Sequence, residues 1–250
     1  MPDTALDQIL RRPDVWQAGR QRLDPRGMPT GFAALDDALH LGGWPSADAV
    51  ELLPGRAGIG EWQLLLPTLA RVSGAGRHTL LLSPPHVPYP PALVAAGIDV
   101  ASVMVIDACQ LTEQLWCAEQ ALRSGAMACV VTWLGGHTLP TSHLRKLLLA
   151  ARQGGSLLFL YRDARLAQHA SPASMRLRLD AATDGGLQVD ILKQPGGWSG
   201  QTATIPRPEP WLEPSPWHLP MGQRAPGAAA GGQGARPLRH GQVRGTDPGR

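Results

Sequence analysis

The stretch LLPGRAGIGEWQLLLP carries the glycine spacing of a loop that binds phosphate. Such a loop reads G-x-x-x-x-G-K-[ST] between a strand and a helix, and Gly55 and Gly60 keep that spacing, with Gly58 between them. In a working loop, backbone N–H groups hold phosphate, the lysine adds a positive charge and the hydroxyl binds magnesium. Here Glu61 and Trp62 follow Gly60. The pattern therefore predicts the geometry of the loop without the charge that attracts a nucleotide.

Glu61 reverses the sign of the largest contribution to phosphate binding. At an effective dielectric constant near ~20, two unit charges about 4 Å apart interact by roughly 4 kcal/mol, so repulsion in place of attraction should weaken triphosphate binding. A carboxylate in the first turn of a helix is also stabilised by the helix dipole. Glu61 is therefore predicted to cap the loop itself, in place of a phosphate. The alternative is an ordinary glycine-rich turn that never bound a nucleotide.

Short apolar runs of strand length alternate with helical patterns through the middle of the chain. Runs that are apolar on both faces are typical of strands buried in a parallel sheet. The alternation implies right-handed crossovers and predicts an α/β fold with a doubly wound, mostly parallel sheet and helices on both faces. The expected strands are residues 49–53, 78–83, 103–107, 128–134 and 156–161.

Three helices are expected between these strands. Pro67 should kink the first helix or cut it short, because proline has no N–H to donate. The second helix should bury an apolar stripe that includes Trp116. The expected starts are Glu61, Thr112 and Ser142, and the second and third helices are expected to end at Gly125 and at Gly154 with Gly155. The third helix is expected to turn Leu144, Leu147, Leu148 and Ala151 inward.

Composition limits the remaining classes of function. A chain of 250 residues with 43% hydrophobic content can bury one main core. No run of about 18 apolar residues is present and the N-terminus is too charged for a signal peptide, so a cytoplasmic protein with no membrane contact is expected. The three cysteines lack C-x-x-C spacing and the eight histidines are scattered, so we expect neither a disulfide framework nor a metal site.

Charge and composition divide the chain into three parts. Residues 1–27 are expected to form a short helix and a connector, and residues 28–206 the folded core. Residues 207–250 carry six Arg against three acidic residues, which accounts for the whole formal charge of +3. This last part is rich in Pro and Gly and is predicted to be a disordered tail, because it cannot bury enough apolar surface to offset its chain entropy.

From about residue 28 to residue 206 the chain resembles the RecA ATPase core. Thr30-Gly31, Leu35-Asp36, Leu39, Gly42-Gly43, Pro45 and Glu51 fall where that family has its T-G-x-x-x-L-D-x-x-L-G-G-G-x-P segment and first strand. The resemblance also shows what is replaced. Pro85 stands where the family's catalytic glutamate follows the second core strand, and Trp133 where its magnesium-linked aspartate ends the fourth. Neither residue can polarise water or order a metal, so a protein without catalysis, cofactor or metal is expected.

The segments that contact DNA in RecA are short in this chain. Only GGHTLPT follows the fourth expected strand, and RDARLAQHASPASMRLRLD follows the fifth, so filament formation around DNA is not expected. The second segment carries Arg162, Arg165, Arg176 and Arg178, which are candidates for an anion-facing patch and a weak DNA contact. The alternative is a solvated arginine surface without a ligand.

Several features together resemble the ImuA family, whose members are RecA-like and are described as similar to SulA. They are the degenerate RecA core, an N-terminal helix ending near DVW, the ASPASMRLRL segment and the basic Pro/Gly tail. The resemblance implies a non-catalytic adaptor in SOS translesion synthesis and mutagenesis. Its implied partners are an ImuB-type pseudo-polymerase and an error-prone DNA polymerase III alpha subunit, with RecA as a further candidate. The alternatives are a SulA-like cell-division inhibitor that binds the division GTPase, and a weak DNA-dependent ATPase or recombinase.

Apolar side chains near both ends of the chain are the candidates for partner binding. The N-terminal helix is expected to dock on another subunit or on RecA; the alternative is that it packs on its own domain. Tryptophans in the tail are expected to anchor a partner; the alternatives are a linker without a role and packing of the first tryptophan on the core. These candidates are Leu6, Ile9, Leu10, Trp16, Trp211 and Trp217.

Overall fold

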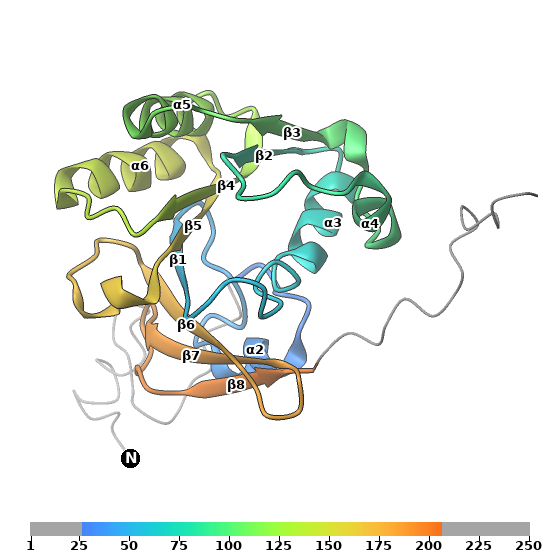
Figure 1. Cartoon of the computed structure of the whole chain (residues 1–250), viewed down its shortest axis with the longest axis vertical. Coiled ribbons are helices and arrows are strands. Elements are labelled where there is room, and N and C mark those ends of the chain that lie inside the picture. Colours follow the sequence, from blue (N-terminus) through green and yellow to red (C-terminus); the bar gives the residue numbers. More distant parts are fainter. Residues whose placement is uncertain (1–26, 207–250) are drawn as a thin grey trace, which may run out of the picture. The chain divides into compact units, whose positions relative to one another are not determined.

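A computed structural model describes residues 27–206 of the chain (Figure 1). Residues 1–26 and 207–250 lie outside the described part, and so do the predictions made for the N-terminal helix and for the tail. The partner-binding candidates in those segments are Leu6, Ile9, Leu10, Trp16, Trp211 and Trp217.

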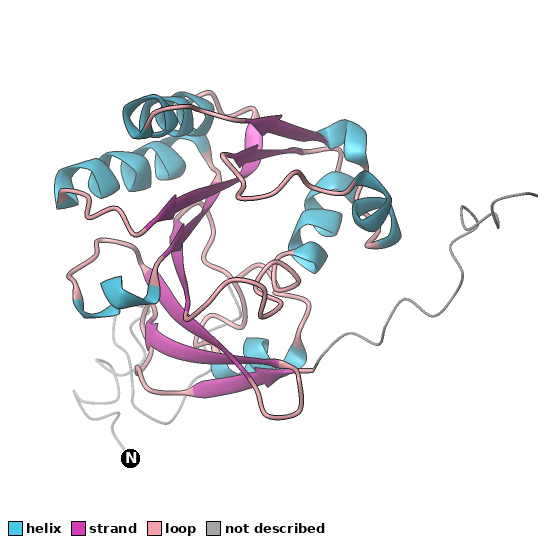
Figure 2. Ribbon diagram, viewed as in Figure 1, coloured by secondary structure: helices cyan, strands magenta, loops and turns pink. Residues whose placement is uncertain are grey.

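The described residues form an α/β fold around one eight-stranded sheet, in the order β3-β2-β4-β5-β1-β6-β7-β8 (Figure 2). The strands from β3 to β6 in this order run parallel, and β7 and β8 add an antiparallel end. All five predicted strands are present, so the predicted mostly parallel sheet is confirmed. The strands are β1 Ala49–Pro54, β2 His78–Leu82, β3 Val103–Ile106, β4 Met127–Gly135, β5 Leu157–Arg162, β6 Met175–Ala181, β7 Leu187–Lys193 and β8 Thr202–Ile205.

Helices cover both faces of the sheet, as the doubly wound prediction requires (Figure 1). Apolar residues of α2, α3 and α4 join one core cluster with the sheet, and those of α5 and α6 join another. Within residues 27–206, every helix falls short of the length or apolar character that a membrane span requires. The helices are α2 Ala33–Ala38, α3 Leu66–Gly74, α4 Pro90–Ala95, α5 Leu111–Arg123 and α6 Thr141–Gly154, with short 3₁₀ turns η1 Val100–Ser102 and η2 Ala164–Gln168.

The segment before β1 is fixed to the core by polar and aromatic contacts. The Thr30 amide donates to Asp36 Oδ1 at 2.8 Å, which closes the turn that leads into α2. Trp44 is fully buried, and its indole N–H donates to Thr68 Oγ1 of α3 at 2.8 Å. Its ring meets Phe159 of β5 edge to face, with centroids 5.1 Å apart. These contacts join residues 30–44 to the centre of the sheet.

The helix after the glycine loop starts later than predicted. We expected it to begin at Glu61, but α3 begins at Leu66, with Pro67 in its first turn. Proline has no N–H to donate to the carbonyl of Gln63, so a helix cannot run through this position without losing a bond, whereas the first turn tolerates it. Residues 61–65 instead form tight turns. Glu61 therefore lies before the helix, and the helix dipole is not what holds it.

The starts of the next two helices and one buried residue also differ from prediction. The expected starts were Thr112 and Ser142, but α5 begins at Leu111 and α6 at Thr141, after Gln110 and Pro140, and neither start has a side-chain cap. Trp116, placed in the apolar stripe of α5, is 65% exposed. The inward residues and the stop of α6 are as predicted, and its C-terminal cap Gly155 has a left-handed φ of 66°.

Strand β6 lies in a segment that we interpreted as loop. Met175, Leu177 and Leu179 are buried while Arg178 between them is exposed, so the alternation MRLRLDA has the two-residue period of a strand. The connection after β5 is therefore shorter than predicted. Arg176 and Arg178 lie on a strand that pairs with β1.

Candidate functional site

The glycine loop after β1 holds the carboxylate of its own Glu61. The Gly58 amide donates to Glu61 Oε1 at 3.1 Å and the Ile59 amide donates to Oε2 at 2.9 Å. Gly58 and Gly60 have φ angles of 78° and 94°, which residues with a Cβ rarely adopt. Consecutive amides turned toward one anion are the feature with which such loops hold phosphate. The predicted self-capping is therefore present, and backbone N–H groups provide it.

An aromatic stack lies beside this loop. Trp62 meets Trp133 of β4, with ring centroids 5.6 Å apart, and Trp133 stacks on Tyr161 of β5 at 5.2 Å with the planes 4° from parallel. Trp133 and Tyr161 are register partners on adjacent parallel strands, so their rings project to the same face of the sheet. The two positions that the RecA resemblance gives to a magnesium-binding hydroxyl and aspartate thus carry two indoles in contact with each other.

Tyr161 ties the stack to the loop. Its hydroxyl donates to the backbone carbonyl of Glu61 at 2.8 Å. Burial raises the pKa of Tyr161 well above its usual value, with the negative charge of Glu61 adding to the shift, so the hydroxyl stays protonated and remains a donor. The sequence analysis missed Tyr161. The signal that could have found it is its place at the end of an apolar run, because the carboxyl ends of parallel strands meet at one edge of a sheet.

Pro85 lies in the exposed segment that follows β2. Ser83, two residues before it, has a left-handed φ of 51°, and the Ser83 hydroxyl accepts a hydrogen bond from the Ala108 amide at 3.2 Å. Proline offers neither a carboxylate nor an N–H to a reacting group. The contacts described above join Glu61, Trp62 and Trp133, but they do not include Pro85.

Two of the four candidate arginines are buried and hold a carboxylate inside the protein. Glu51 of β1 is fully buried, and its carboxylate contacts Arg162 Nη1 at 2.6 Å and Arg176 Nε. Arg162 also donates to the His137 carbonyl, and Arg176 to the carbonyls of Leu166 and Ala167. The Glu51–Arg162–Arg176 cluster therefore fixes the connections after β4 and β5 to the sheet.

The other two arginines are exposed and paired with neighbouring acids. Arg165 binds Asp163 through Nε and Nη2 at 3.0 and 2.8 Å, and Arg178 binds Asp180 at 2.8 Å. Hydrogen bonds from Arg165 hold the pKa of Asp163 below its usual value. The predicted anion-facing patch of four arginines is therefore wrong: Arg162 and Arg176 are inside, and both exposed arginines already face a carboxylate.

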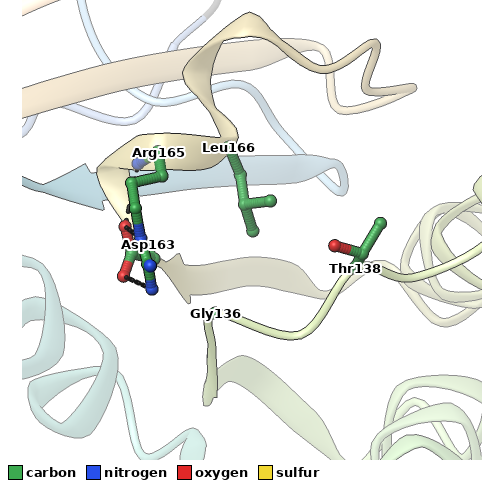
Figure 3. Close-up of a pocket in the computed structure, with 5 residues that line it drawn as sticks. All are labelled: Gly136, Thr138, Asp163, Arg165 and Leu166. Atoms are coloured by element: carbon green, nitrogen blue, oxygen red, sulfur yellow. Dashed lines mark hydrogen bonds and ion pairs between the residues drawn. The ribbon is translucent and has the colours of Figure 1, made fainter.

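A small hollow lies between the connections after β4 and β5 (Figure 3). Its volume is about 210 Å³, and the Arg165 guanidinium at its rim is turned onto the Asp163 carboxylate rather than into the space. Its polar lining is thus neutral overall. Within residues 27–206 no group of three or more His, Cys, Asp or Glu side chains is placed to hold a metal ion. The lining residues are Gly136, Thr138, Asp163, Arg165 and Leu166.

Comparison with known proteins points to two related groups. Residues 58–158 match the family model of the cell division inhibitor SulA. The RecA protein of Clavibacter michiganensis is 31% identical over 133 residues, which is 52% of this chain and 36% of that protein. The RecA proteins of Symbiobacterium thermophilum and Frankia alni are 30% and 28% identical over 134 and 137 residues, covering 38% and 39% of their own lengths.

The chain is similar to both RecA and SulA. It spans well under half the length of these RecA proteins, so the similarity supports the fold and a RecA- or SulA-related origin rather than the whole activity of a RecA protein. The SulA match starts inside the glycine loop and ends in β5. It therefore includes Glu61, Trp62 and Trp133, but neither Tyr161 nor the candidate arginines.

Proposed function

We propose that this protein is a non-catalytic RecA-like accessory protein in SOS-induced translesion DNA synthesis and mutagenesis. In this role it acts in the cytoplasm as an adaptor that brings together an ImuB-type pseudo-polymerase and an error-prone DNA polymerase III alpha subunit. The observation that carries the proposal is the glycine loop, whose amides hold Glu61 in place of a phosphate. A scaffold kept in this form suits binding to other proteins better than turnover of a nucleotide.

Three features of the site support the absence of catalysis. A phosphate that approached the loop would compete with a carboxylate already bound to two amides and would meet its negative charge. Trp62 and Trp133 of the aromatic stack stand at the positions that the RecA resemblance gives to the hydroxyl and the carboxylate that order magnesium. Pro85 supplies no base to activate water. Restoring one of these parts would leave the others missing.

The setting in DNA damage is supported by the similarity to RecA and SulA and by the features shared with the ImuA family. RecA similarity covers about half of the chain, and the SulA match covers residues 58–158. The assignment to ImuA, with its ImuB and polymerase partners, rests on the helix predicted from the N-terminal sequence, the ASPASMRLRL segment and the basic composition of residues 207–250. RecA is a third candidate partner, and DNA contact is proposed to be weak.

Damage-induced mutation in a strain that lacks the gene tests the proposal. Mutation frequency after ultraviolet irradiation should fall to the unirradiated level, and the full chain supplied in trans should restore it. Affinity capture of the full chain from damaged cells should recover the pseudo-polymerase. Unchanged induced mutagenesis in the deletion strain would contradict the role in translesion synthesis.

The match to the SulA model favours a second candidate, a SulA-like inhibitor that binds the division GTPase. The two roles predict different phenotypes. Overproduction of an inhibitor should make undamaged cells grow as filaments and should slow polymerisation of the purified division GTPase. Overproduction of a translesion adaptor should leave cell length unchanged. A gene for an ImuB-type protein beside this one would also favour the adaptor.

A further inference from the structure

Two neighbouring helices each carry one large apolar side chain on the side that faces solvent. Trp116 of α5 is 65% exposed and Leu149 of α6 is 52% exposed. The buried residues of both helices join the same core cluster with the sheet, so these two side chains lie on the opposite, outer side. Figure 1 shows α5 and α6 side by side, and the two helices are in contact. Together they form an outer face with two apolar centres.

The two exposed side chains lie at nearly the same height along this face. Both helices connect parallel strands of the sheet, so α5 and α6 run in the same direction. The helices touch where Gly154 meets the backbone of Leu122, since an added Cβ at Gly154 would lie 1.8 Å from the Leu122 carbonyl oxygen. Trp116 precedes Leu122 by six residues and Leu149 precedes Gly154 by five. At about 1.5 Å of rise per residue, the heights of the two side chains differ by about one residue.

The charges around the two exposed side chains have opposite signs. Residues three and four positions apart are neighbours on the surface of a helix. All charged neighbours of the tryptophan are acidic, and all those of the leucine are basic. They are Glu113 and Glu119 around Trp116, and Arg145, Lys146 and Arg152 around Leu149.

Three of these five charges have no ion pair within residues 27–206. The two that are paired form the ion pairs Glu119–Arg123 and Arg152–Asp48. The three others, Glu113, Arg145 and Lys146, are exposed. The outer face therefore has an acidic half on α5 and a basic half on α6, each with an apolar centre, and the two halves are complementary to each other.

We propose that two copies of this chain form a dimer in which α5 of each copy packs on α6 of the other. A twofold axis that runs between the two helices and along them produces this arrangement and keeps residues of equal height opposite each other. The acidic half then meets the basic half twice, and both exposed apolar side chains become buried. A partner that was only acidic or only basic would match one helix and be repelled by the other. The contacts that form twice are Glu113 with Lys146, Trp116 with Leu149 and Glu119 with Arg152.

The mass of the full chain in solution tests this dimer. Light scattering over a concentration series should give twice the chain mass of 26.6 kDa. Glu113→Lys and Lys146→Glu should each raise the dissociation constant at least about tenfold, because like charges then meet twice across the axis. The double variant should restore the wild-type constant, since the two charges are then exchanged. A single-chain mass for the wild type, or a double variant as weak as the single variants, would overturn the proposal.

Removal of the tryptophan tests the apolar contact. Trp116→Ala should give the single-chain mass, because a large aromatic side chain at the centre of an interface carries much of the binding energy. The matched control is Tyr89→Ala, which removes a different aromatic side chain that is 68% exposed and should leave the dimer intact. Circular dichroism spectra that match the wild type would exclude unfolding as the cause. A dimer that persists in Trp116→Ala would contradict the proposal.

Disulfide trapping identifies the residues that face each other. In a background with Cys109→Ser and Cys117→Ser, mild oxidation of a mixture of Trp116→Cys chains and Leu149→Cys chains should give a covalent dimer that contains one of each. The second contact between Trp116 and Leu149 stays intact in this mixed dimer. Either variant oxidised alone should give no covalent dimer, because α5 lies opposite α6 and not opposite itself. Cross-linking of Trp116→Cys chains with each other would overturn the arrangement.

Discussion

At the scale of single residues, Glu61 and Glu51 show how the same side chain serves two different sites. Glu61 is partly exposed and is held by backbone amides of the glycine loop. Glu51 is fully buried and is held by Arg162 and Arg176. The Glu61 carboxylate thus caps the amides of the glycine loop, whereas the Glu51 carboxylate joins the strands and connections around it.

Removing the charge of Glu51 should strongly lower the free energy of unfolding. In Glu51→Gln, two arginines stay buried without their anion, and breaking a buried ion pair typically costs about 3 to 5 kcal/mol. The exposed pair formed by Arg165 and Asp163 is the matched control, because solvent screens it. Urea unfolding should therefore show a large fall in stability for Glu51→Gln and an unchanged midpoint for Arg165→Gln. Equal behaviour of the two variants would contradict a structural role for the buried cluster.

Tyr161 should make stability depend on pH in the alkaline range. Its pKa is raised in the folded state, so its contribution is fully present below the unfolded pKa of about 10 and is lost as the pH rises above that value. Tyr161→Phe keeps the ring but loses the hydrogen bond to the Glu61 carbonyl, which should cost about 1 kcal/mol at neutral pH.

The difference in unfolding free energy between wild type and Tyr161→Phe should then shrink above pH 10 or so, as measured by urea unfolding across the pH range. The exposed Tyr89 provides the control, since Tyr89→Phe should match the wild type throughout. A constant difference at all pH values would show that the Tyr161 hydroxyl does not titrate as the structure requires.

At the scale of elements, the crossing of α5 and α6 depends on one glycine. A Cβ added to Gly154 would lie 1.8 Å from the Leu122 carbonyl oxygen, which is backbone and cannot move aside alone. Gly154→Ala should therefore destabilise the protein by about 1 to 3 kcal/mol, as overpacking usually does. Gly74, at the end of α3, has no atom within 4 Å of the same position.

The matched change Gly74→Ala should leave stability unchanged or raise it by up to about 1 kcal/mol, because alanine restricts the unfolded chain. Thermal unfolding of the two variants measures the contrast. If Gly154→Ala proved as stable as Gly74→Ala, the close packing of the two helices would be wrong.

The elements also show which parts of the fold the sequence predicts. Five of the six parallel strands are short apolar runs in the sequence, and this local pattern is enough to find them. The starts of α5 and α6 were predicted one residue late because Gln110 and Pro140, which precede them, make no side-chain cap that would mark the start in the sequence. Strand β6 was missed although its alternation is visible, because arginines at every second position looked like a solvated loop.

The candidate site was predicted only in part, for a related reason. Glu61, Trp62 and Trp133 were found from their places in motifs, and the self-capping of the loop follows from the charge of Glu61. The stack with Tyr161 and the ion cluster around Glu51 depend on the register between strands that are distant in sequence. Burial of Arg162 and Arg176 depends on the same register, which composition does not reveal.

At the scale of the whole molecule, the adaptor role predicts that folding and partner binding are separable. A chain ending at Pro206 should keep the thermal stability of the full protein but lose binding to the ImuB-type partner. The full chain with Trp211→Ala and Trp217→Ala should lose binding equally, because aromatic anchors carry much of the energy of an interface. Unchanged binding by either variant would refute docking through the tail, and a large fall in stability would show that the tail belongs to the fold.

The central claim is that the glycine loop belongs to a protein that does not turn over ATP. ATP hydrolysis by the purified full chain, measured with single-stranded DNA and magnesium and with an active RecA protein as reference, tests it most directly. The account predicts background rates for the wild type and for the double variant Glu61→Lys, Trp62→Thr, because Pro85 and Trp133 still leave the site without a base and a metal ligand. DNA-stimulated turnover by the wild type, or clear turnover by the double variant, would contradict it.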